Sequence, residues 1–441
     1  MSDHTVDQMT DLAPRPPVVV LDDDPTGTQA VANVPVLLEW DPRLIAESVS
    51  NGAAALHLLT NSRAFPPERA YAITRGAAEA AVAAFGRPRI AMRGDSTLRA
   101  HLVEEYRAVS DAAFRGRTPP LLLVPALPHA GRITVDGVHL LERDGHRTPL
   151  HETEYATDPG FAYADARLVA WAEERSAGFF AASAGSEVHL EQLRSEGPAA
   201  VTAALLALAA AGSPAVCVPD AETLADLETV AEGLRAAEEA GAEVLVRCAP
   251  TFAGVYAGTL AQGHVQPPSD GRPLLVVCGS WMPSTTRQLA TLLAGHPGTL
   301  VETDVEALAS DEPEGEIDRG ARAASDRLAS GGLAVVATSR KPPAATWNFE
   351  AGQRVALNLA RVAARVEPRP AVVLAKGGIT SHVTARVGLD ARRGTVLGPL
   401  VDGVALWRLE TGAGRPVSYV VFPGNVGSDG TLLDVVDLML G

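Results

Sequence analysis

Cysteine is scarce in this chain, with three residues among 441. Cys217, Cys248 and Cys278 each lie in an apolar run typical of a strand, and their spacing does not fit a metal site. A pattern of this kind excludes a thiolate metal centre. We therefore expect three buried free thiols in a reducing cytoplasm.

Positive charge is also scarce, because 37 Lys and Arg face 53 Asp and Glu, for a net charge of −16. Nucleic acid requires a basic surface, so we expect no nucleic-acid partner. The negative net charge does not exclude a small anionic substrate, because binding depends on the local electrostatic field of the site.

Long hydrophobic runs are missing as well. The longest apolar stretch, residues 203–211, predicts an alanine-rich helix of about three turns, too short to cross a bilayer. Nothing in the sequence resembles a signal peptide. We expect a cytoplasmic protein with no membrane partner.

The remaining composition suits a globular α/β protein. Hydrophobic residues make up 46% of the chain, and its length predicts two domains. Apolar runs alternate with helical stretches, the pattern of parallel sheets with crossover helices. A Pro- and Gly-rich segment, residues 263–273, predicts a linker. We expect a disordered tail at residues 1–15, an N-terminal domain at 16–262 and a C-terminal domain at 274–441.

Eleven segments are predicted to be strands. They are residues 18–22, 54–60, 89–92, 121–124, 215–218, 243–247, 274–278, 333–338, 371–375, 404–409 and 418–422. Polar and glycine residues follow many of these strands in both halves. Open α/β sheets place their ligands at the carboxyl ends of strands. The fold prediction is therefore two parallel-sheet α/β domains with the active site in the cleft between them.

Three consecutive aspartates follow the first predicted strand, in the segment VVVLDDDPTGTQA. Asp22, Asp23 and Asp24 repel one another, and folding alone gives no reason for them. They suit metal binding, recognition of sugar hydroxyls or proton abstraction. The alternative is a solvated turn with a helix N-cap.

A second polar cluster follows the strand at residues 89–92, in RGDSTLRAH. Arg93 can bind a substrate carboxylate in a bidentate manner, and Asp95 and Ser96 can bind hydroxyls. Alternatively, Asp95 or Ser96 caps a helix that starts near Leu98.

Two further loops offer polar side chains. His129 can act as a base and Arg132 as an anion clamp in PHAGR, although a loop histidine often has no such role. Asn61 and Arg63 in TNSRAF are a similar, weaker case.

The second half contains glycine turns after three strands. Paired glycines in KGGITS allow backbone N–H groups to approach a phosphate, and GS at 279–280 and PGNVG at 423–427 are similar. No Walker signature occurs. Together the turns predict a nucleotide site, with ordinary loops as the alternative.

The segment DDDPT also satisfies the D-x-D-x-T pattern of haloacid-dehalogenase-type sugar phosphatases. Asp22 would then be the nucleophile, Asp24 the acid/base and Thr26 a neighbour. Such an enzyme needs a lysine beside the aspartates, and both lysines, Lys341 and Lys376, lie in the second half.

Taken together, DDDPTGT, RGDSTLR, PHAGR, KGGITS and PGNVG resemble the four-carbon acid sugar kinase family, over essentially the whole chain. The resemblance implies an N-terminal sugar-acid-binding domain, a C-terminal nucleotide-binding domain, and ATP with Mg²⁺ as cofactors. It implies phosphorylation of a terminal hydroxyl of a 3-oxo-tetronate, threonate or erythronate. The resemblance leaves the metal ligands and the stereoisomer open, and a homodimer is one candidate assembly.

The expected site residues follow from the motifs and the resemblance together. Asp24 and Asp95 are the catalytic candidates. Those for substrate binding are Asp23, Thr28, Asn61, Arg63, Arg93, Ser96, His129 and Arg132. Those for nucleotide binding are Ser280, Gly377, Gly378, Ile379, Thr380, Gly424 and Asn425.

Two positions depart from the family pattern. Phe422 stands where members often have a lysine, and Met282 where a serine is common. These departures leave a third hypothesis open, a catalytically inactive sensor of sugar acids or nucleotides.

Overall fold

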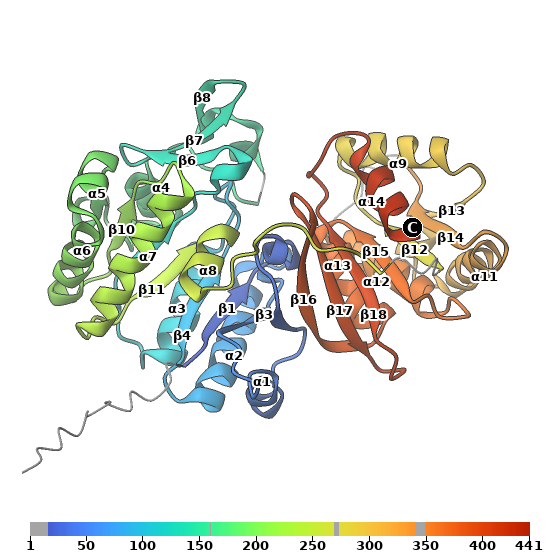
Figure 1. Ribbon diagram of the computed structural model, residues 1–441, viewed down its shortest axis with the longest axis horizontal. Helices are drawn as coiled ribbons and strands as arrows, with labels where there is room; N and C mark the ends of the chain where they lie inside the picture. The colour runs from blue at the N-terminus through green and yellow to red at the C-terminus, as the bar shows by residue number, and fades with distance from the viewer. Residues whose placement is uncertain (1–15, 159, 269–272, 341–348) are drawn as a thin grey trace, which may run out of the picture.

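A long twisted sheet runs through the whole molecule (Figure 1). The computed structural model describes residues 16–158, 160–268, 273–340 and 349–441. Within them, fifteen strands form one sheet in the order β13-β14-β12-β15-β18-β17-β16-β2-β3-β1-β4-β11-β5-β10-β9. A smaller sheet, β6-β7-β8, lies at the edge of the N-terminal half.

The N-terminal half contains eight parallel strands of the long sheet and the small antiparallel sheet. The strands are β1 (Val18–Asp22), β2 (Val34–Leu37), β3 (Ala55–Leu59), β4 (Arg89–Arg93), β5 (Leu121–Val124), β6 (Arg132–Val135), β7 (Val138–Arg143), β8 (His146–Pro149), β9 (Ser186–Val188), β10 (Val216–Pro219) and β11 (Leu245–Cys248). The helices are α1 (Pro42–Ser48), α2 (Pro67–Phe85), α3 (Leu102–Ala113), α4 (Leu168–Arg175), α5 (Leu190–Glu196), α6 (Pro198–Ala211), α7 (Leu224–Glu239) and α8 (Pro250–Ala257). The short 3₁₀ helices are η1 (Pro25–Ala30), η2 (Ser62–Ala64), η3 (Pro128–Ala130), η4 (Leu150–Glu152), η5 (Glu154–Thr157) and η6 (Ala182–Ala184).

The C-terminal half completes the long sheet. Its strands are β12 (Leu274–Cys278), β13 (Leu300–Thr303), β14 (Leu333–Thr338), β15 (Val372–Lys376), β16 (Ala391–Val401), β17 (Val404–Thr411) and β18 (Val417–Phe422). Its helices are α9 (Pro283–Gly295), α10 (Val305–Ala309), α11 (Glu314–Gly331), α12 (Phe349–Ala364), α13 (Gly378–Val383), the π-helix η7 (Thr384–Gly388) and α14 (Thr431–Leu440).

The sheet is mixed, which corrects the prediction of two purely parallel sheets. β16 and β17 form an antiparallel hairpin, and β17 runs antiparallel to β18. β16 also pairs antiparallel with β2, joining residues 393–396 to residues 34–37. We call this pairing of β16 with β2 the seam, because it connects the two halves through backbone hydrogen bonds.

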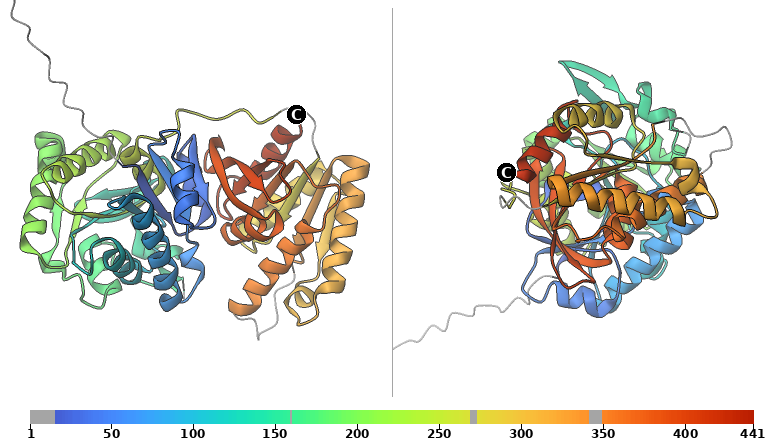
Figure 2. Two further views of the ribbon diagram at one scale, coloured as in Figure 1. Left: turned by 90° about the horizontal axis from the view of Figure 1, so that it is seen from below. Right: turned by 90° about the vertical axis from the view of Figure 1, so that its right-hand side faces the viewer.

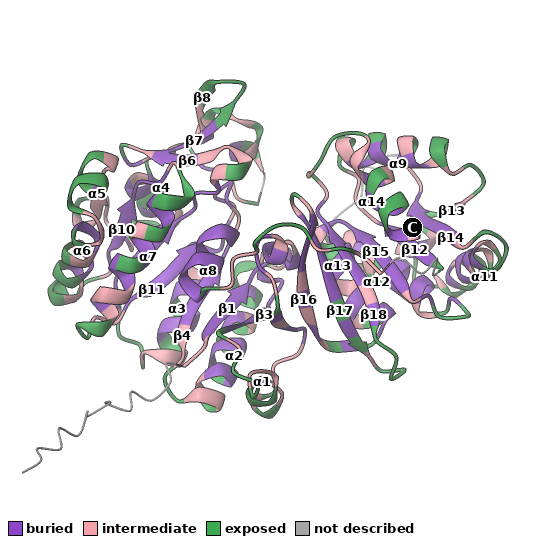
Figure 3. Cartoon of the chain, viewed as in Figure 1, coloured by how far each residue is buried: buried purple, intermediate pink, exposed green. Residues whose placement is uncertain are grey.

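Helices cover both faces of the sheet and bury its apolar side chains (Figures 2 and 3). In the N-terminal half, α1 to α4 pack on one face and α5 to α8 on the other. In the C-terminal half, α10 to α12 cover one face, and α9 and α14 the other. One core cluster extends from Phe252 of α8 through Trp407 of β17 to Leu359 of α12. The two halves therefore share a core as well as a sheet.

The predicted strands at 18–22, 121–124, 274–278 and 333–338 match the structure, and the others differ by one or two residues. β2, β6 to β9, β13 and β16 were not predicted. The three cysteines are buried and free, as expected. Residues 203–211 lie within α6, and no described helix is long and apolar enough to span a membrane.

The described part of segment 263–273 contains no helix or strand. Residues 269–272 of that segment and the predicted tail at residues 1–15 lie outside the described residues.

Candidate functional site

A cavity of about 1250 Å³ lies between the two halves. Loops that follow β1, β3, β4 and β5 line it on one side, and loops that follow β12, β15 and β18 line it on the other. All of the predicted site residues except Asp23 and Thr28 line this cavity. The sequence signals from both halves therefore meet at one place.

Asp22 is buried beneath the cavity and is not accessible as a nucleophile. Its side chain is fully buried, accepts a hydrogen bond from His57 Nδ1 at 2.9 Å and forms an ion pair with Arg93. A phosphoryl-accepting aspartate must face its substrate. The burial of Asp22 contradicts the phosphatase alternative.

Asp23 also lies behind the cavity wall. Its carboxylate oxygens accept no hydrogen bond from a described residue, and they lie 3.3 Å from Arg93 Nη1 and 3.8 Å from Arg247 Nη2. Burial raises the pKa of Asp23 to about 6, although Arg63, Arg93 and Arg247 favour its charged form. Asp23 is therefore not among the residues that line the cavity, and its expected contact with substrate stays a prediction.

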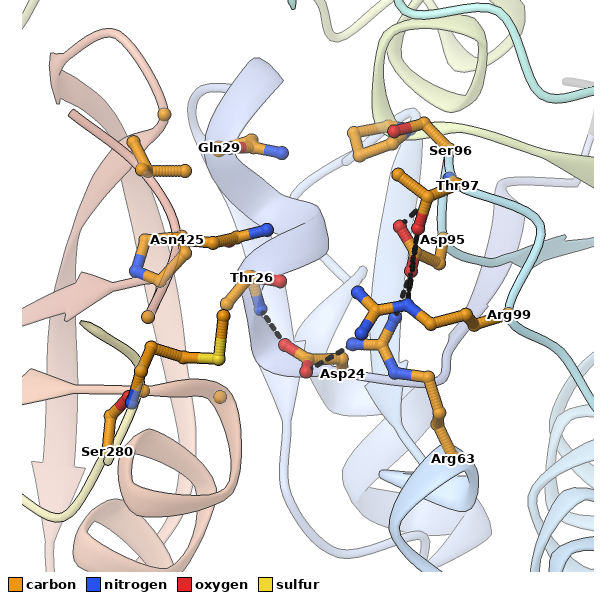
Figure 4. A pocket seen from close by; sticks show the side chains of 18 of the residues that line it. Asp24, Thr26, Gln29, Arg63, Asp95, Ser96, Thr97, Arg99, Ser280 and Asn425 are labelled. Atoms are coloured by element: carbon orange, nitrogen blue, oxygen red, sulfur yellow. Dashed lines mark hydrogen bonds and ion pairs between the residues drawn. The ribbon is translucent and has the colours of Figure 1, made fainter. Parts of the chain in front are cut away.

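Asp24 is the aspartate that reaches the cavity. It caps η1 by accepting a hydrogen bond from Thr26 N at 2.8 Å, and it forms an ion pair with Arg63 (Figure 4). Burial opposes ionisation of Asp24, but Arg63 and Arg93 outweigh it and lower the pKa of this carboxyl. A carboxylate is therefore present at neutral pH.

Asp24 also lies directly against the nucleotide half. A Cβ atom placed on Gly378 would be 2.2 Å from Asp24 Oδ2, so any side chain at this position of the KGGITS turn would displace the Asp24 carboxylate. The candidate base and a candidate phosphate loop are therefore in contact across the cavity.

Arg93 is surrounded by carboxylates. It contacts Asp22 and Asp23 and donates to the backbone carbonyl of Asp24, and its guanidinium packs against Gly27. A Cβ on Gly27 would overlap the Arg93 side chain, which explains the glycine of the PTGT turn. Because its charge is already compensated, Arg93 has little left for a substrate carboxylate.

Asp95 organises a turn. Its carboxylate accepts hydrogen bonds from Thr97 N at 3.1 Å, Thr97 Oγ1 at 2.6 Å and Arg99 Nε at 2.5 Å. Burial opposes ionisation, but Arg99 and Arg63 outweigh it and lower the pKa of Asp95. The predicted helix near Leu98 is wrong, because Leu98 has φ of 68° and α3 begins at Leu102.

Arg63 links the two catalytic candidates. Figure 4 shows the Arg63 side chain beside Asp24 and Asp95. Its guanidinium contacts Asp24 and lies 3.4 Å from Asp95 Oδ2. Asn61, in a left-handed conformation with φ of 50°, turns the chain after β3 so that Arg63 points into the cavity.

Ser96 is held by the small sheet. His139 of β7 lies with Nε2 2.9 Å from the Ser96 carbonyl oxygen and with Nδ1 3.0 Å from Thr134 Oγ1. Burial lowers the pKa of His139 to about 4, so this ring is neutral.

His129 and Arg132 of the N-terminal half also line the cavity. Burial lowers the pKa of His129, and its Nδ1 lies 3.5 Å from Thr251 Oγ1. Arg132 donates to the Ala130 carbonyl oxygen at 3.0 Å and to the Tyr155 hydroxyl at 3.4 Å, and among the described residues it has no carboxylate partner. Arg132 is therefore available for an anion.

Thr28 points away from the cavity. It is fully buried, donates to the Pro25 carbonyl oxygen at 3.1 Å and accepts a hydrogen bond from Trp407 Nε1 at 2.9 Å. Its position supports a contact between η1 and β17, and the expectation of substrate binding is not supported.

The glycine turns of the C-terminal half pack against one another. Cβ atoms placed on Gly279 and Gly424 would lie 2.6 Å from Thr380 Oγ1 and 2.9 Å from Ser280 Oγ. The three turns form one surface of the cavity, and Figure 4 shows Ser280 and Asn425 across from Asp24.

The two departures from the family pattern have different surroundings. Beside Phe422 lies Lys376 of the neighbouring strand, with its Nζ 3.9 Å from the centre of the Phe422 ring. Met282 lines the cavity and is 49% exposed.

Several cavity residues were not predicted. Thr97 and Arg99 belong to the RGDSTLR segment, so their place in that motif was the available signal. Gln29 comes from η1 and Asp402 from the β16–β17 turn, and neither residue has a sequence signal of a binding or catalytic role. The seam between β2 and β16 brings the segments that carry Gln29 and Asp402 together at the cavity.

Comparisons with known proteins agree with the two halves. A sugar-binding N-terminal domain family matches residues 18–256, and a nucleotide-binding C-terminal domain family matches residues 275–432. The chain is 25% identical over 408 residues to D-threonate kinase of Salmonella typhimurium strain LT2, covering 89% of this chain and 90% of that protein.

Solved structures share the fold. A protein of Salmonella typhimurium LT2 described as a candidate tRNA synthase gives a TM-score of 0.70 at 21% identity, covering 95% of this chain and 98% of that one. A Haemophilus influenzae protein of family DUF1537 gives a TM-score of 0.65 at 17% identity, covering 96% and 100%. At these identities the likeness concerns the fold alone.

A sugar-binding half that faces a nucleotide-binding half across one cavity is the arrangement of a small-molecule kinase. The chain belongs to the four-carbon acid sugar kinase family. Kinase activity with a nucleotide follows at the level of the family.

Proposed function

We propose that this protein is an ATP-dependent kinase that phosphorylates a terminal hydroxyl of a four-carbon sugar acid of the 3-oxo-tetronate, threonate or erythronate type. The observation that carries the proposal is the contact of Asp24 with Gly378. It puts a charged carboxylate of the sugar half beside the glycine turns, where a hydroxyl and a terminal phosphate would meet. Such a kinase works in the cytoplasm, where ATP is available.

Asp24 is the residue that accepts the proton as the hydroxyl attacks the terminal phosphate. Phosphoryl transfer depends mainly on positioning and electrostatics, so a carboxylate with a lowered pKa can fill this role. Asp95 is less suited, because its oxygens accept three hydrogen bonds, from Thr97 and Arg99, whereas those of Asp24 accept two, from Thr26 and Arg63. Asp95 instead positions Arg63 and Arg99 for the substrate hydroxyls.

Arg132 binds the substrate carboxylate. Arg93 is enclosed by three aspartates, Arg63 contacts Asp24 and Asp95, and Arg99 contacts Asp95. Arg132 has only neutral partners among the described residues. Arg132 begins β6 of the sugar-binding half and lines the same cavity as Asp24, so a carboxylate held by Arg132 would leave the far end of the acid to reach Asp24.

The glycine turns fit the phosphates of ATP. Any side chain at Gly279, Gly378 or Gly424 would collide with neighbouring atoms, so bare backbone borders the cavity there. Backbone N–H groups in such turns bind phosphate oxygens. Mg²⁺ would arrive on the nucleotide and neutralise charge during transfer, and we assign it no protein ligand.

The test is ADP release with ATP, Mg²⁺ and a panel of four-carbon acids: D- and L-threonate, D- and L-erythronate, and their 2-oxo and 3-oxo forms. We expect turnover on one member. Asp24→Asn should lower kcat by about 10²- to 10⁴-fold, the usual contribution of a general base. ADP binding by this variant should stay close to that of the wild type.

Each other outcome has a defined meaning. Turnover by Asp24→Asn at the wild-type rate would remove Asp24 as the base. Binding of ATP with no turnover on any acid would favour the sensor hypothesis, and failure to bind ATP would refute the kinase proposal.

A further inference from the structure

Lys376 is a buried cation beneath the glycine turns. It ends β15, just before Gly377, and its side chain is fully buried. On either side lie its strand neighbours Cys278 of β12 and Phe422 of β18. Its Nζ donates to the Pro423 carbonyl oxygen at 2.5 Å.

No described carboxylate lies within ion-pair distance of this ammonium group. From β12 it faces the Cys278 thiol, and the loop after β14 contributes Arg340, which donates to the Cys278 carbonyl oxygen at 3.4 Å. β18 contributes only the Phe422 ring. Lys376 thus meets a thiol, a carbonyl oxygen and an aromatic ring, but no described carboxylate.

The two helices over this face of the sheet, α9 and α14, add apolar side chains. Their charged groups lie at the surface: Arg287 pairs with Asp429, and Asp437 pairs with His296. Asp434 is exposed. A buried ammonium group without an anion is costly, and burial lowers the pKa of Lys376 to about 7.

The Pro423 carbonyl connects Lys376 to the cavity. The carbonyl and the N–H of a trans peptide point in opposite directions, so Lys376 directs the Gly424 N–H away from itself. Gly424 lines the cavity, and its own carbonyl accepts hydrogen bonds from Ser284 and Thr285. The ammonium group and these hydroxyls fix the turn from behind.

We propose that Lys376 is the internal counter-charge of the nucleotide site: it orients the Pro423–Gly424 peptide toward the phosphates and takes up a proton when ADP or ATP binds. This inference rests on the proposed kinase function. Lys376 acts as a positioning residue, because Pro423 and Gly424 lie between it and the cavity.

The direction of the pH dependence follows from the charge. Below pH 7 Lys376 is already protonated in the free protein, and nucleotide binds without proton uptake. Nearby phosphates favour the ammonium form and raise its pKa. Above pH 7, binding must therefore include proton uptake, and ADP affinity should fall by up to about tenfold per pH unit.

The experiment is calorimetric titration of the full-length protein with ADP and Mg²⁺ at pH 8.5, in two buffers of different ionisation enthalpy, Tris and Bicine. ADP is fully ionised at this pH. We expect the wild type to take up close to one proton, on the order of the charge that Lys376 gains. Lys376→Met, an apolar replacement suited to a buried site, should take up none and bind ADP about tenfold more weakly.

Lys376→Arg is the matched variant, because arginine stays charged. It should bind ADP more tightly than Lys376→Met and still take up no proton. Equal proton uptake by the wild type and Lys376→Met would overturn the inference while leaving nucleotide binding intact.

The wild type provides a test even when neither variant folds. Its ADP dissociation constant measured from pH 6.5 to 9 should rise above pH 7, and a flat profile would also overturn the inference. Absence of ADP binding by the wild type would refute the proposed function and this inference with it.

Discussion

Arg93 and Arg132 show how neighbours decide what an arginine can do. From the sequence both were expected to bind substrate. In the structure Arg93 is enclosed by Asp22, Asp23 and the Asp24 backbone, whereas Arg132 meets only neutral oxygens. The two arginines thus differ in whether neighbouring carboxylates already neutralise their charge, and only the structure shows this difference.

We predict that Arg132→Gln raises KM for the sugar acid by about 10- to 100-fold, as expected when a charged hydrogen bond is lost. The corresponding neutral tetritol, which lacks the carboxylate, should be affected far less. Steady-state kinetics on both compounds measure this discrimination. A similar loss for acid and tetritol would show that Arg132 does not bind the carboxylate.

His139 makes a second prediction at the residue scale, on stability. Its pKa is about 4 in the folded protein, below the ordinary value of about 6.5. As pH falls from about 6.5 to 4, the unfolded chain binds a proton that the folded protein does not. The free energy of unfolding should therefore drop, by about 2 kcal/mol at pH 5 from this group.

Urea denaturation at pH 7.5 and pH 5 checks the effect. His139→Gln has no titrating ring, and its amide can still donate to the Ser96 carbonyl. The wild type should lose about 2 kcal/mol more than this variant between the two pH values. Equal losses would contradict a neutral, buried His139.

At the level of elements, the start of α13 is tightly constrained. We predict that Gly378→Ala displaces Asp24, because the new Cβ would lie 2.2 Å from Asp24 Oδ2. Misplacement by about 1 Å can cost about 100-fold in rate, so kcat should fall strongly.

Gly315→Ala is the matched control for this change. Gly315 lies in α11 of the same half, and nothing lies within 4 Å of a Cβ placed there. It should leave kcat unchanged and stabilise its helix by up to about 1 kcal/mol. Thermal melts measure the stability of both variants, and steady-state kinetics measure their kcat. Normal activity of Gly378→Ala would disprove the proposed contact.

The elements differ in how well the sequence predicts them. Buried parallel strands such as β1, β5, β12 and β14 have continuous apolar runs, which local pattern reveals. β16 alternates buried and partly buried residues around Gly394 and Gly398, so its run is interrupted. Asp402 and Gly403, the two residues between β16 and β17, are a hairpin signal that indicates the missing strand.

The candidate site likewise contains residues that the local sequence pattern predicts and residues that it does not. The motifs at strand ends were sufficient to predict fifteen residues of the cavity lining, because carboxyl ends of strands gather ligands. Asp23 and Thr28 could not be separated from Asp24 by pattern, since adjacent residues of a turn point in different directions. Their burial depends on Arg247 and Trp407, which are distant in sequence.

At the scale of the whole molecule, the seam and the shared core predict that both halves unfold together. We expect a single transition in scanning calorimetry, shifted upward as one peak by ADP. Two separate transitions, with only one responding to ADP, would show that the halves are independent. The oligomeric state stays a prediction, and light scattering can test whether the protein forms a homodimer.

The seam has a further consequence during synthesis on the ribosome. β2 emerges early, yet its partner in β16 follows roughly 360 residues later along the chain. At a translation rate of about 5–20 residues per second, this edge of β2 stays unpaired for roughly 20–70 s. Pro35, which has no N–H to offer a foreign strand, lies in the middle of this waiting edge. The β16–β17 hairpin is therefore made near the end of translation. Its pairing covers an edge of β2 that has been exposed since the first strands were made.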